Sequence, residues 1–200
     1  MLLAFPSLAA EVPLPDLRIE PTDGGSVFYI RNNTVQTLKA YLIELVDYPG
    51  SSYSFWQDET VAEPLPPKGE RRIQVTNMTV GAVPDYVKMR AALYADGSTA
   101  GVPEKIAQLM DRRRTMLETV RQVIARMESA QDDAAKAGLP AGLRRWADTF
   151  VPQGKNRNTP AAMNQAAAYG IVVGAAQRIE RQSFADTLAL LRGWETALTK

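Results

Sequence analysis

The chain has 200 residues, a formal net charge of +1, 46% hydrophobic residues and 22% charged residues. This is the composition of an ordinary globular protein with one large domain or two small ones. It contains no cysteine and no histidine, which excludes disulfides, thiolate catalysis and cysteine-ligated metals and removes the commonest general base and zinc ligand. A net charge near zero gives no indication of nucleic-acid binding, so no nucleic-acid partner is expected.

Residues 1–10, MLLAFPSLAA, form an apolar run that ends in small residues. This pattern is typical of the hydrophobic and cleavage regions of a signal peptide, although no basic residue precedes it. We therefore interpret residues 1–10 as a truncated signal peptide and expect the mature protein to be secreted or periplasmic. An apolar N-terminal strand is the alternative interpretation.

Residues 11–102 predict a series of short antiparallel strands. Apolar and polar residues alternate over residues 71–76 and again within residues 86–102, as expected for half-buried strands. Asp96-Gly97 interrupts the second of these stretches and is a strong hairpin signal. Six or seven short strands at this spacing indicate a β-sandwich.

The segment 36–47 is apolar on both faces of its predicted strand. Two sets of apolar residues alternate along it, with Leu38, Ala40, Leu42 and Val46 on one face and Tyr41, Ile43 and Leu45 on the other. An antiparallel sandwich needs only one apolar face. We therefore expect the helices that follow Pro103 to cover the outer face of this sheet.

Three stretches of the β region resemble a known type of module: NNTVQTLKAYLIELV (32–46), PPKGERRIQV (66–75) and ALYADGSTAG (92–101). They resemble immunoglobulin-like modules of uncharacterised secreted bacterial proteins, over residues 17–102. In those modules a strand follows an Asn-Asn turn, a Pro/Gly turn precedes a middle strand and a DG hairpin closes the sheet. The resemblance implies an immunoglobulin-like fold and no catalytic residue.

After residue 102 the apolar residues recur at three- and four-residue steps, which predicts about three helices. They are expected from Pro103 to near Gly138, from Pro140 to Phe150, and from Pro160 to about Leu198 with a break near residues 182–183. No stretch has about 18 uninterrupted apolar residues, so no transmembrane segment is expected. The predicted fold class is α+β: an immunoglobulin-like antiparallel β-sandwich over residues 11–102, followed by a helical segment over 103–200 that packs on it.

A cluster of aromatic residues offers one candidate site. Tyr48, Tyr53 and Trp56 precede the carboxylates of Asp58 and Glu59, and aromatic rings beside carboxylates can bind sugars, so the three rings are candidate ligand contacts. The alternative is that they are core or cross-strand residues. Asp58 and Glu59 are adjacent and would point to opposite faces of a strand, which makes them a poor acid–base pair for glycoside hydrolysis.

A run of arginines offers a second candidate site. Arg112, Arg113 and Arg114 lie inside the first predicted helix, with Arg113 at an apolar position of its stripe, and they are candidate contacts for an anionic partner. The alternative is that their aliphatic stems cover the edge of the stripe. Residues 103–200 carry 15 Lys/Arg against 10 Asp/Glu, a net of +5, whereas residues 11–102 carry 8 against 12, a net of −4. Either the two halves attract each other or the basic surface faces a partner.

The sequence contains neither a glycine-rich phosphate loop nor a GxSxG turn, so no pattern predicts a particular reaction. We expect an exported, non-catalytic binding or structural module without a cofactor, for which another envelope or secreted protein is a candidate partner. A carbohydrate-binding module that uses Tyr48, Tyr53 and Trp56 is the alternative.

Overall fold

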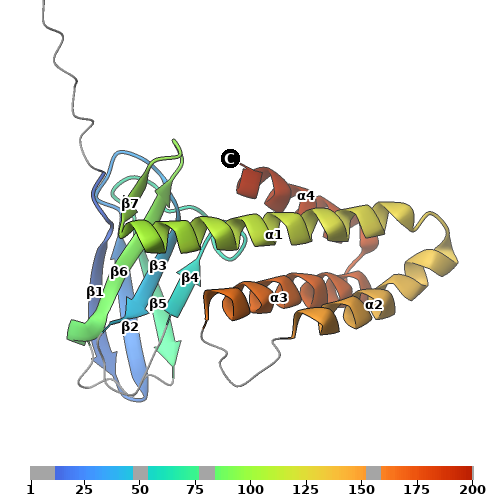
Figure 1. Ribbon diagram of the computed structural model, residues 1–200, viewed down its shortest axis with the longest axis horizontal. Helices are drawn as coiled ribbons and strands as arrows, with labels where there is room; N and C mark the ends of the chain where they lie inside the picture. Colours follow the sequence, from blue (N-terminus) through green and yellow to red (C-terminus); the bar gives the residue numbers. More distant parts are fainter. Residues whose placement is uncertain (1–11, 47–53, 77–83, 152–158, 200) are drawn as a thin grey trace, which may run out of the picture.

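The computed structural model describes residues 12–46, 54–76, 84–151 and 159–199. Within these residues seven β-strands come first and four α-helices follow, so the chain is α+β. Short 3-10 helices lie at Pro84–Tyr86 and Asp148–Phe150. Figure 1 shows the strands gathered at one end of the molecule and the helices extending away from them.

The strands form two antiparallel sheets. One sheet has the order β1-β2-β5 and contains β1 (Asp16–Thr22), β2 (Gly25–Arg31) and β5 (Glu70–Thr76). The other has the order β4-β3-β6-β7 and contains β3 (Leu38–Leu45), β4 (Ser54–Gln57), β6 (Val87–Tyr94) and β7 (Thr99–Gly101). The predicted Asp96-Gly97 turn joins β6 to β7. Gly97 has a positive φ of 84° but Asp96 does not, so the turn is not the type I′ turn that Asp-Gly favours.

An inter-sheet core holds the two sheets together. Phe28 and Ile30 of β2 meet Tyr41 and Ile43 of β3 and Tyr94 of β6, and all five side chains are fully buried. Each contributes about 1.5–3 kcal/mol by leaving water, before the entropy cost of ordering is counted. The alternation of β3 therefore places Tyr41 and Ile43 inside the sandwich, not on its outer face.

The two buried tyrosines make the fold sensitive to alkaline pH. Burial raises the pKa of Tyr41 and of Tyr94 from 10.0 to about 12; nearby Arg71 partly opposes this for Tyr41. The Tyr94 hydroxyl also donates to the carbonyl oxygen of Pro13 at 2.6 Å. The folded state thus favours the neutral phenol, so this contribution to stability is complete below the unfolded pKa and is lost as pH rises through the folded pKa.

We therefore expect the free energy of unfolding to fall as the pH rises from about 10 to about 12. Urea denaturation at a series of pH values measures this. The fall should be smaller in Tyr41→Phe and Tyr94→Phe variants, which cannot ionise. The same pH dependence in wild type and in both variants would contradict the assignment.

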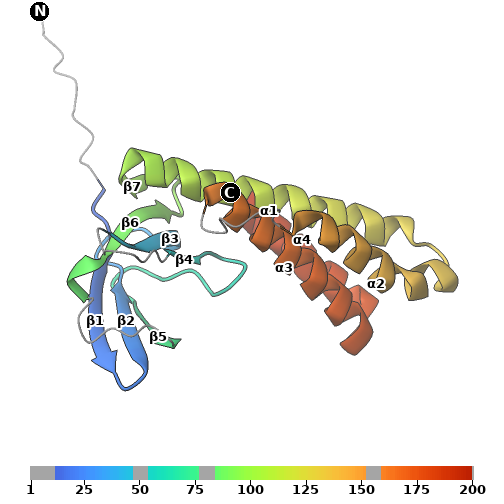
Figure 2. The same ribbon diagram turned by 60° about the horizontal axis from the view of Figure 1, so that its bottom comes forward.

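Four helices follow the sandwich, where about three were predicted: α1 (Pro103–Ser129), α2 (Asp133–Ala147), α3 (Pro160–Arg181) and α4 (Phe184–Thr199). α1 runs away from the strands, α2 returns, α3 runs away again and α4 brings the C-terminus back towards the sandwich (Figures 1 and 2). None of the described helices is long and apolar enough to cross a membrane.

The predicted boundary between the first two helices was wrong. α1 ends at Ser129 rather than near Gly138, and α2 contains Pro140 instead of beginning there. The carboxylate of Asp132 accepts a hydrogen bond from the Ala135 amide at 2.7 Å and so caps α2. A proline inside a helix costs about 3 kcal/mol, and burial of Pro140 and Leu143 against the neighbouring helices offsets that cost.

The apolar stripe of α1 divides between two neighbours. Its first turns place Ile106 and Leu109 on the outer face of the β4-β3-β6-β7 sheet, in a small cluster that also contains Ala40, Leu42, Ala91, Leu93 and Trp56. The rest of the stripe packs among the helices, in a bundle core that includes Met116, Val120, Val123, Ile124, Met127, Leu143, Val172 and Leu191. The start of α1 therefore supplies the apolar cover of the sheet, and most of the helical segment forms its own core.

Candidate binding site at the junction of sandwich and helices

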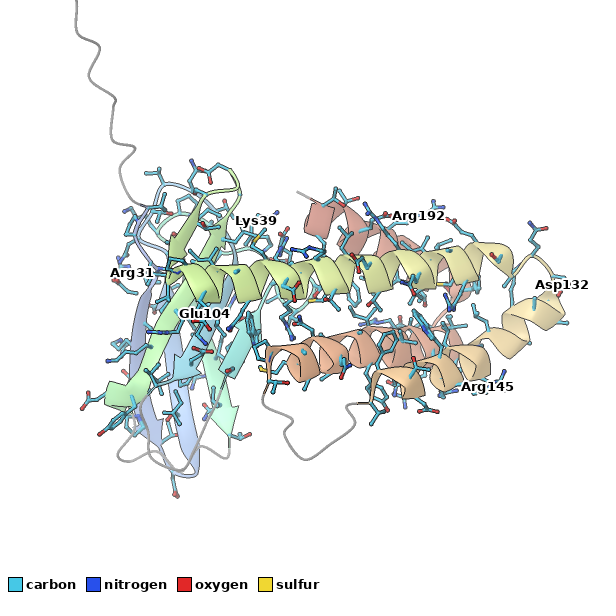
Figure 3. All side chains as sticks on the ribbon, viewed as in Figure 1. Arg31, Lys39, Glu104, Asp132, Arg145 and Arg192 are labelled. Carbon is cyan, nitrogen blue, oxygen red and sulfur yellow. The ribbon has the colours of Figure 1, made fainter. Side chains whose placement is uncertain are left out.

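Parts of three helices meet the sandwich beside strands β3 and β4. We call this region the junction: the beginning of α1, the beginning of α3 and the end of α4 approach the sheet there. Figure 3 shows Lys39, on β3, at this boundary between the strands and the helices. The junction contains Trp56 of the aromatic set and Arg112 and Arg113 of the arginine set.

A buried carboxylate holds two cations at the junction. Glu59 Oε1 accepts from Lys39 Nζ at 2.8 Å and from Arg113 Nη2 at 3.1 Å. The side chains of Lys39, Glu59 and Arg113 are 7%, 10% and 4% exposed, respectively. We call these three residues the Glu59 cluster. Because β3, the loop after β4 and α1 each supply one member, the cluster ties the sandwich to the helices.

The same two cations also complete the end of α4. Lys39 Nζ and Arg113 Nη2 donate to the carbonyl oxygen of Ala197 at 3.3 Å and 3.2 Å. The last carbonyls of a helix have no partner within the helix, and the helix dipole makes that end negative. Both cations are therefore stabilised by α4 as well as by Glu59.

Beside this cluster, Arg112 joins Trp56 of β4 to helix α3. The Arg112 guanidinium lies over the Trp56 ring at 5.4 Å from its centroid, and Nη1 donates to the carbonyl oxygen of Met163 at 3.1 Å. Burial lowers the pKa of Arg112, and the nearby carboxylate of Asp58 opposes this shift. An arginine remains charged at neutral pH even so, so the junction holds a cation largely removed from water.

A pocket of about 330 Å³ opens between β4, α1 and α3. We call it the junction pocket, and it is lined by Ser54, Phe55, Trp56, Arg112, Met163, Ala166 and Ala167. Trp56 Nε1 and Arg112 Nε are shielded from solvent and find no hydrogen-bond partner. The pocket thus combines apolar walls with the guanidinium of Arg112, while the two unpartnered donor atoms lie beneath its surface.

The structure brings together one residue from each candidate set. Trp56, chosen as a ligand contact, and Arg112, chosen as a partner contact, line the same pocket. Arg113 is buried in the Glu59 cluster, whereas Arg114 is exposed and pairs with Asp111 at 3.4 Å. Tyr48 and Tyr53 lie outside the described residues.

Two neighbouring carboxylates of the junction have separate tasks. Asp58 accepts from the amide and the hydroxyl of Thr60 at 2.8 Å and 2.6 Å, whereas Glu59 binds the two cations.

Lys39 was not identified as a site residue from the sequence. The signal that could have found it is its position as the one basic residue of the apolar segment 36–47.

Comparison of the chain with protein-family models, with curated proteins and with solved structures found no match. The functional argument therefore rests on the residues of the junction themselves.

Proposed function

We propose that the chain is an exported, non-catalytic binding module and that it binds its ligand in the junction pocket. The observation that carries this proposal is the composition of the pocket, which has aromatic and apolar walls beside one largely buried guanidinium. Ligand pockets commonly lie at boundaries between structural units and combine apolar walls with a few polar groups.

The proposal includes an immunoglobulin-like sandwich as the scaffold. If β1, β2 and β5 are strands A, B and E, and β3, β4, β6 and β7 are strands C, C′, F and G, the sheet orders become A-B-E and C′-C-F-G. This order follows the pattern of immunoglobulin-like sandwiches, with C′ added beside C. The strand order therefore supports the resemblance of residues 17–102 to such modules.

The surroundings of Ser54 support binding rather than catalysis. Its hydroxyl donates to Glu44 at the long distance of 3.5 Å. Glu44 in turn is engaged by Lys105 at 2.9 Å and by Arg90 at 3.7 Å. Both carboxylate oxygens of Glu44 already face a cation, and the contact with Ser54 is long, so the geometry does not favour activation of the serine as a nucleophile.

Fluorescence of Trp56 tests whether the pocket binds ligands. The chain has three tryptophans, so a Trp146→Phe/Trp194→Phe variant reports on Trp56 alone. We expect a saturable change with at least one compound from a panel of small aromatic acids, their neutral amides and cell-wall glycans. A response to glycans alone would favour the carbohydrate-binding alternative.

A variant that fills the pocket provides the control. Ala166 lines the pocket and is exposed on α3, as is Ala161, which does not line it. Ala166→Leu is expected to weaken binding by about tenfold or more, and Ala161→Leu to leave it unchanged. The proposal is wrong if no compound changes the fluorescence, or if both variants bind like their parent.

Export is supported by the apolar run of residues 1–10, which ends in Leu8-Ala9-Ala10. We expect expression of the gene in a bacterial host to give a secreted product. N-terminal sequencing should show cleavage after Ala9 or Ala10, and an uncleaved cytoplasmic product would contradict export. Another envelope or secreted protein remains the candidate partner.

A further inference from the structure

The edge of β6 is only partly covered by its neighbour β7. β7 pairs with Ala91, Ala92 and Leu93, and the Val102 amide then donates to the carbonyl oxygen of Arg90 at 2.9 Å. No other described strand pairs with this edge. The sheet therefore has a vacant strand position beside the first half of β6.

The chain leaves the sheet at this point because of its own sequence. Gly101 has a φ of 116°, and a Cβ added to it would lie 2.2 Å from the Arg90 carbonyl oxygen. In the same register Pro103 would oppose Met89, but proline has no amide hydrogen to donate, and it begins α1 instead. The vacant position therefore continues the line of β7, and the residues that follow β7 do not fill it.

Three backbone groups of β6 face the vacant position. The Val46 amide donates to the Tyr86 carbonyl at 2.8 Å, so this carbonyl points towards β3. Hydrogen-bonding groups alternate in direction along a strand, so the carbonyl of Val87 and both the amide and the carbonyl of Met89 point away from β3. None of these three groups is bonded by another described residue. A strand that continues the line of β7 can bond to all three.

A slot beside these groups provides room for the side chains of such a strand. It has a volume of about 530 Å³ and lies between β1 and the first half of β6, which are neighbours in the fold (Figure 1). Its apolar walls include Leu14, Leu17, Ile19 and Met89, which are half-buried and pack on the inter-sheet core. Val87 and Met89 point to the core side of β6, so residues paired with them would point into the slot as well.

The outer face of β6 sets the charge of the added strand. Lys88 is exposed on this face and forms no ion pair with another described residue. Glu44 lies opposite it on β3 but is engaged by Arg90 and Lys105. Opposite charges on neighbouring strands stabilise a sheet. A carboxylate on the added strand, beside Lys88, would therefore form a favourable pair.

From these features we propose that the edge of β6 binds an extended peptide of a partner protein, which adds to the sheet antiparallel to β6. Two apolar residues of the peptide enter the slot opposite Met89 and Val87, and the acidic residue between them lies beside Lys88. The junction pocket lies beside β4, at the other edge of the same sheet. The inference therefore does not depend on the ligand of that pocket.

NMR titration of the isotope-labelled full chain with the peptide acetyl-Ser-Thr-Val-Glu-Val-Thr-Ser-amide tests the proposal. We expect saturable shifts centred on Lys88 and Met89, and slower hydrogen exchange of the Met89 amide. A peptide with both valines N-methylated keeps its side chains but loses the two donors for the carbonyls of Met89 and Val87. It should bind about tenfold more weakly. A peptide with lysine in place of glutamate should bind about threefold more weakly.

Lys88→Glu tests the charge preference from the side of the protein. It should weaken binding of the glutamate peptide and strengthen binding of the lysine peptide. Arg72→Glu is the matched control, because it makes the same change of charge at an exposed position of β5, and it should bind both peptides as the wild type does. If Lys88→Glu fails to fold, the comparison of the three peptides on the wild-type chain still decides.

Four results would overturn the inference. One is the absence of saturable binding at millimolar peptide, and another is equal binding of the N-methylated peptide, which would exclude strand pairing. Shifts that leave Lys88 and Met89 unaffected would place the peptide elsewhere. A chain that forms dimers in analytical ultracentrifugation and binds no peptide would show that a second copy covers this edge.

Discussion

Glu59→Gln is expected to destabilise the folded chain by about 3–5 kcal/mol, the usual effect of removing one partner from a buried ion pair. Glutamine keeps the size of the side chain but removes its charge. Lys39 and Arg113 would then remain buried beside each other with no carboxylate between them. The carbonyl of Ala197 carries only a partial charge, so it cannot replace Glu59.

Urea denaturation measures this effect, with Glu118→Gln as the control. Glu118 is exposed on α1, so its substitution should change stability by less than about 0.5 kcal/mol. Adding Lys39→Met to Glu59→Gln removes one of the two stranded cations. The double variant should therefore be less destabilised than the sum of the single variants. A Glu59→Gln variant as stable as Glu118→Gln would show that the cluster does not hold the junction.

The members of this cluster show why sequence patterns locate a charge more readily than its partner. Lys39 interrupts an apolar strand and Arg113 interrupts an apolar helical stripe, so each is visible as an exception. Glu59 lies in a loop, where no hydrophobic periodicity makes a charged residue stand out. It is 54 positions away from Arg113 in the sequence. Only the packing of α1 on the sheet brings the three together.

The same limit applies to the candidate site. Trp56 and Arg112 were each selected from the sequence, but for two different sites and two different ligands. The aromatic cluster was judged by residues near in sequence, whereas the ring actually shares a pocket with α1 and α3. The type of each residue indicated a site at both positions, but the sequence did not predict that the two residues would lie beside each other.

The helical pattern predicted α1 but not the surface that each part of it covers. The stripe from Ile106 to Met127 has one period throughout, yet its beginning packs on the sheet and its remainder packs in the bundle core. The hydrophobic periodicity of a helix predicts which of its faces is buried, but it does not predict which other element packs on that face. The apolar outer face of β3, by contrast, did predict that something would cover the sheet, and α1 does.

This division changes what removal of the helices would expose. A fragment that ends at residue 102 would uncover the outer-face residues Ala40, Leu42, Ala91 and Leu93. Tyr41 and Ile43 would stay in the inter-sheet core. The exposed area is made of small and medium side chains, so a single residue of α1 should account for much of the docking energy.

Leu109 is that residue, and Leu109→Ala is expected to destabilise the chain by about 2–5 kcal/mol. Its side chain is 1% exposed and belongs to the cluster on the outer face of the sheet. The alanines at positions 40 and 91 are too small to fill the cavity that the substitution leaves. Met110→Ala is the matched control, because Met110 is the next residue of α1 and is 40% exposed.

Amide hydrogen exchange distinguishes loss of docking from general unfolding. Leu109→Ala should reduce protection first in β6 and in the first turns of α1, because these are the elements that its side chain joins. Val123→Ala, in the bundle core, should instead reduce protection first in the helices that surround it. If Leu109→Ala is as stable as Met110→Ala, or if it loosens the same amides as Val123→Ala, α1 does not dock on the sheet through Leu109.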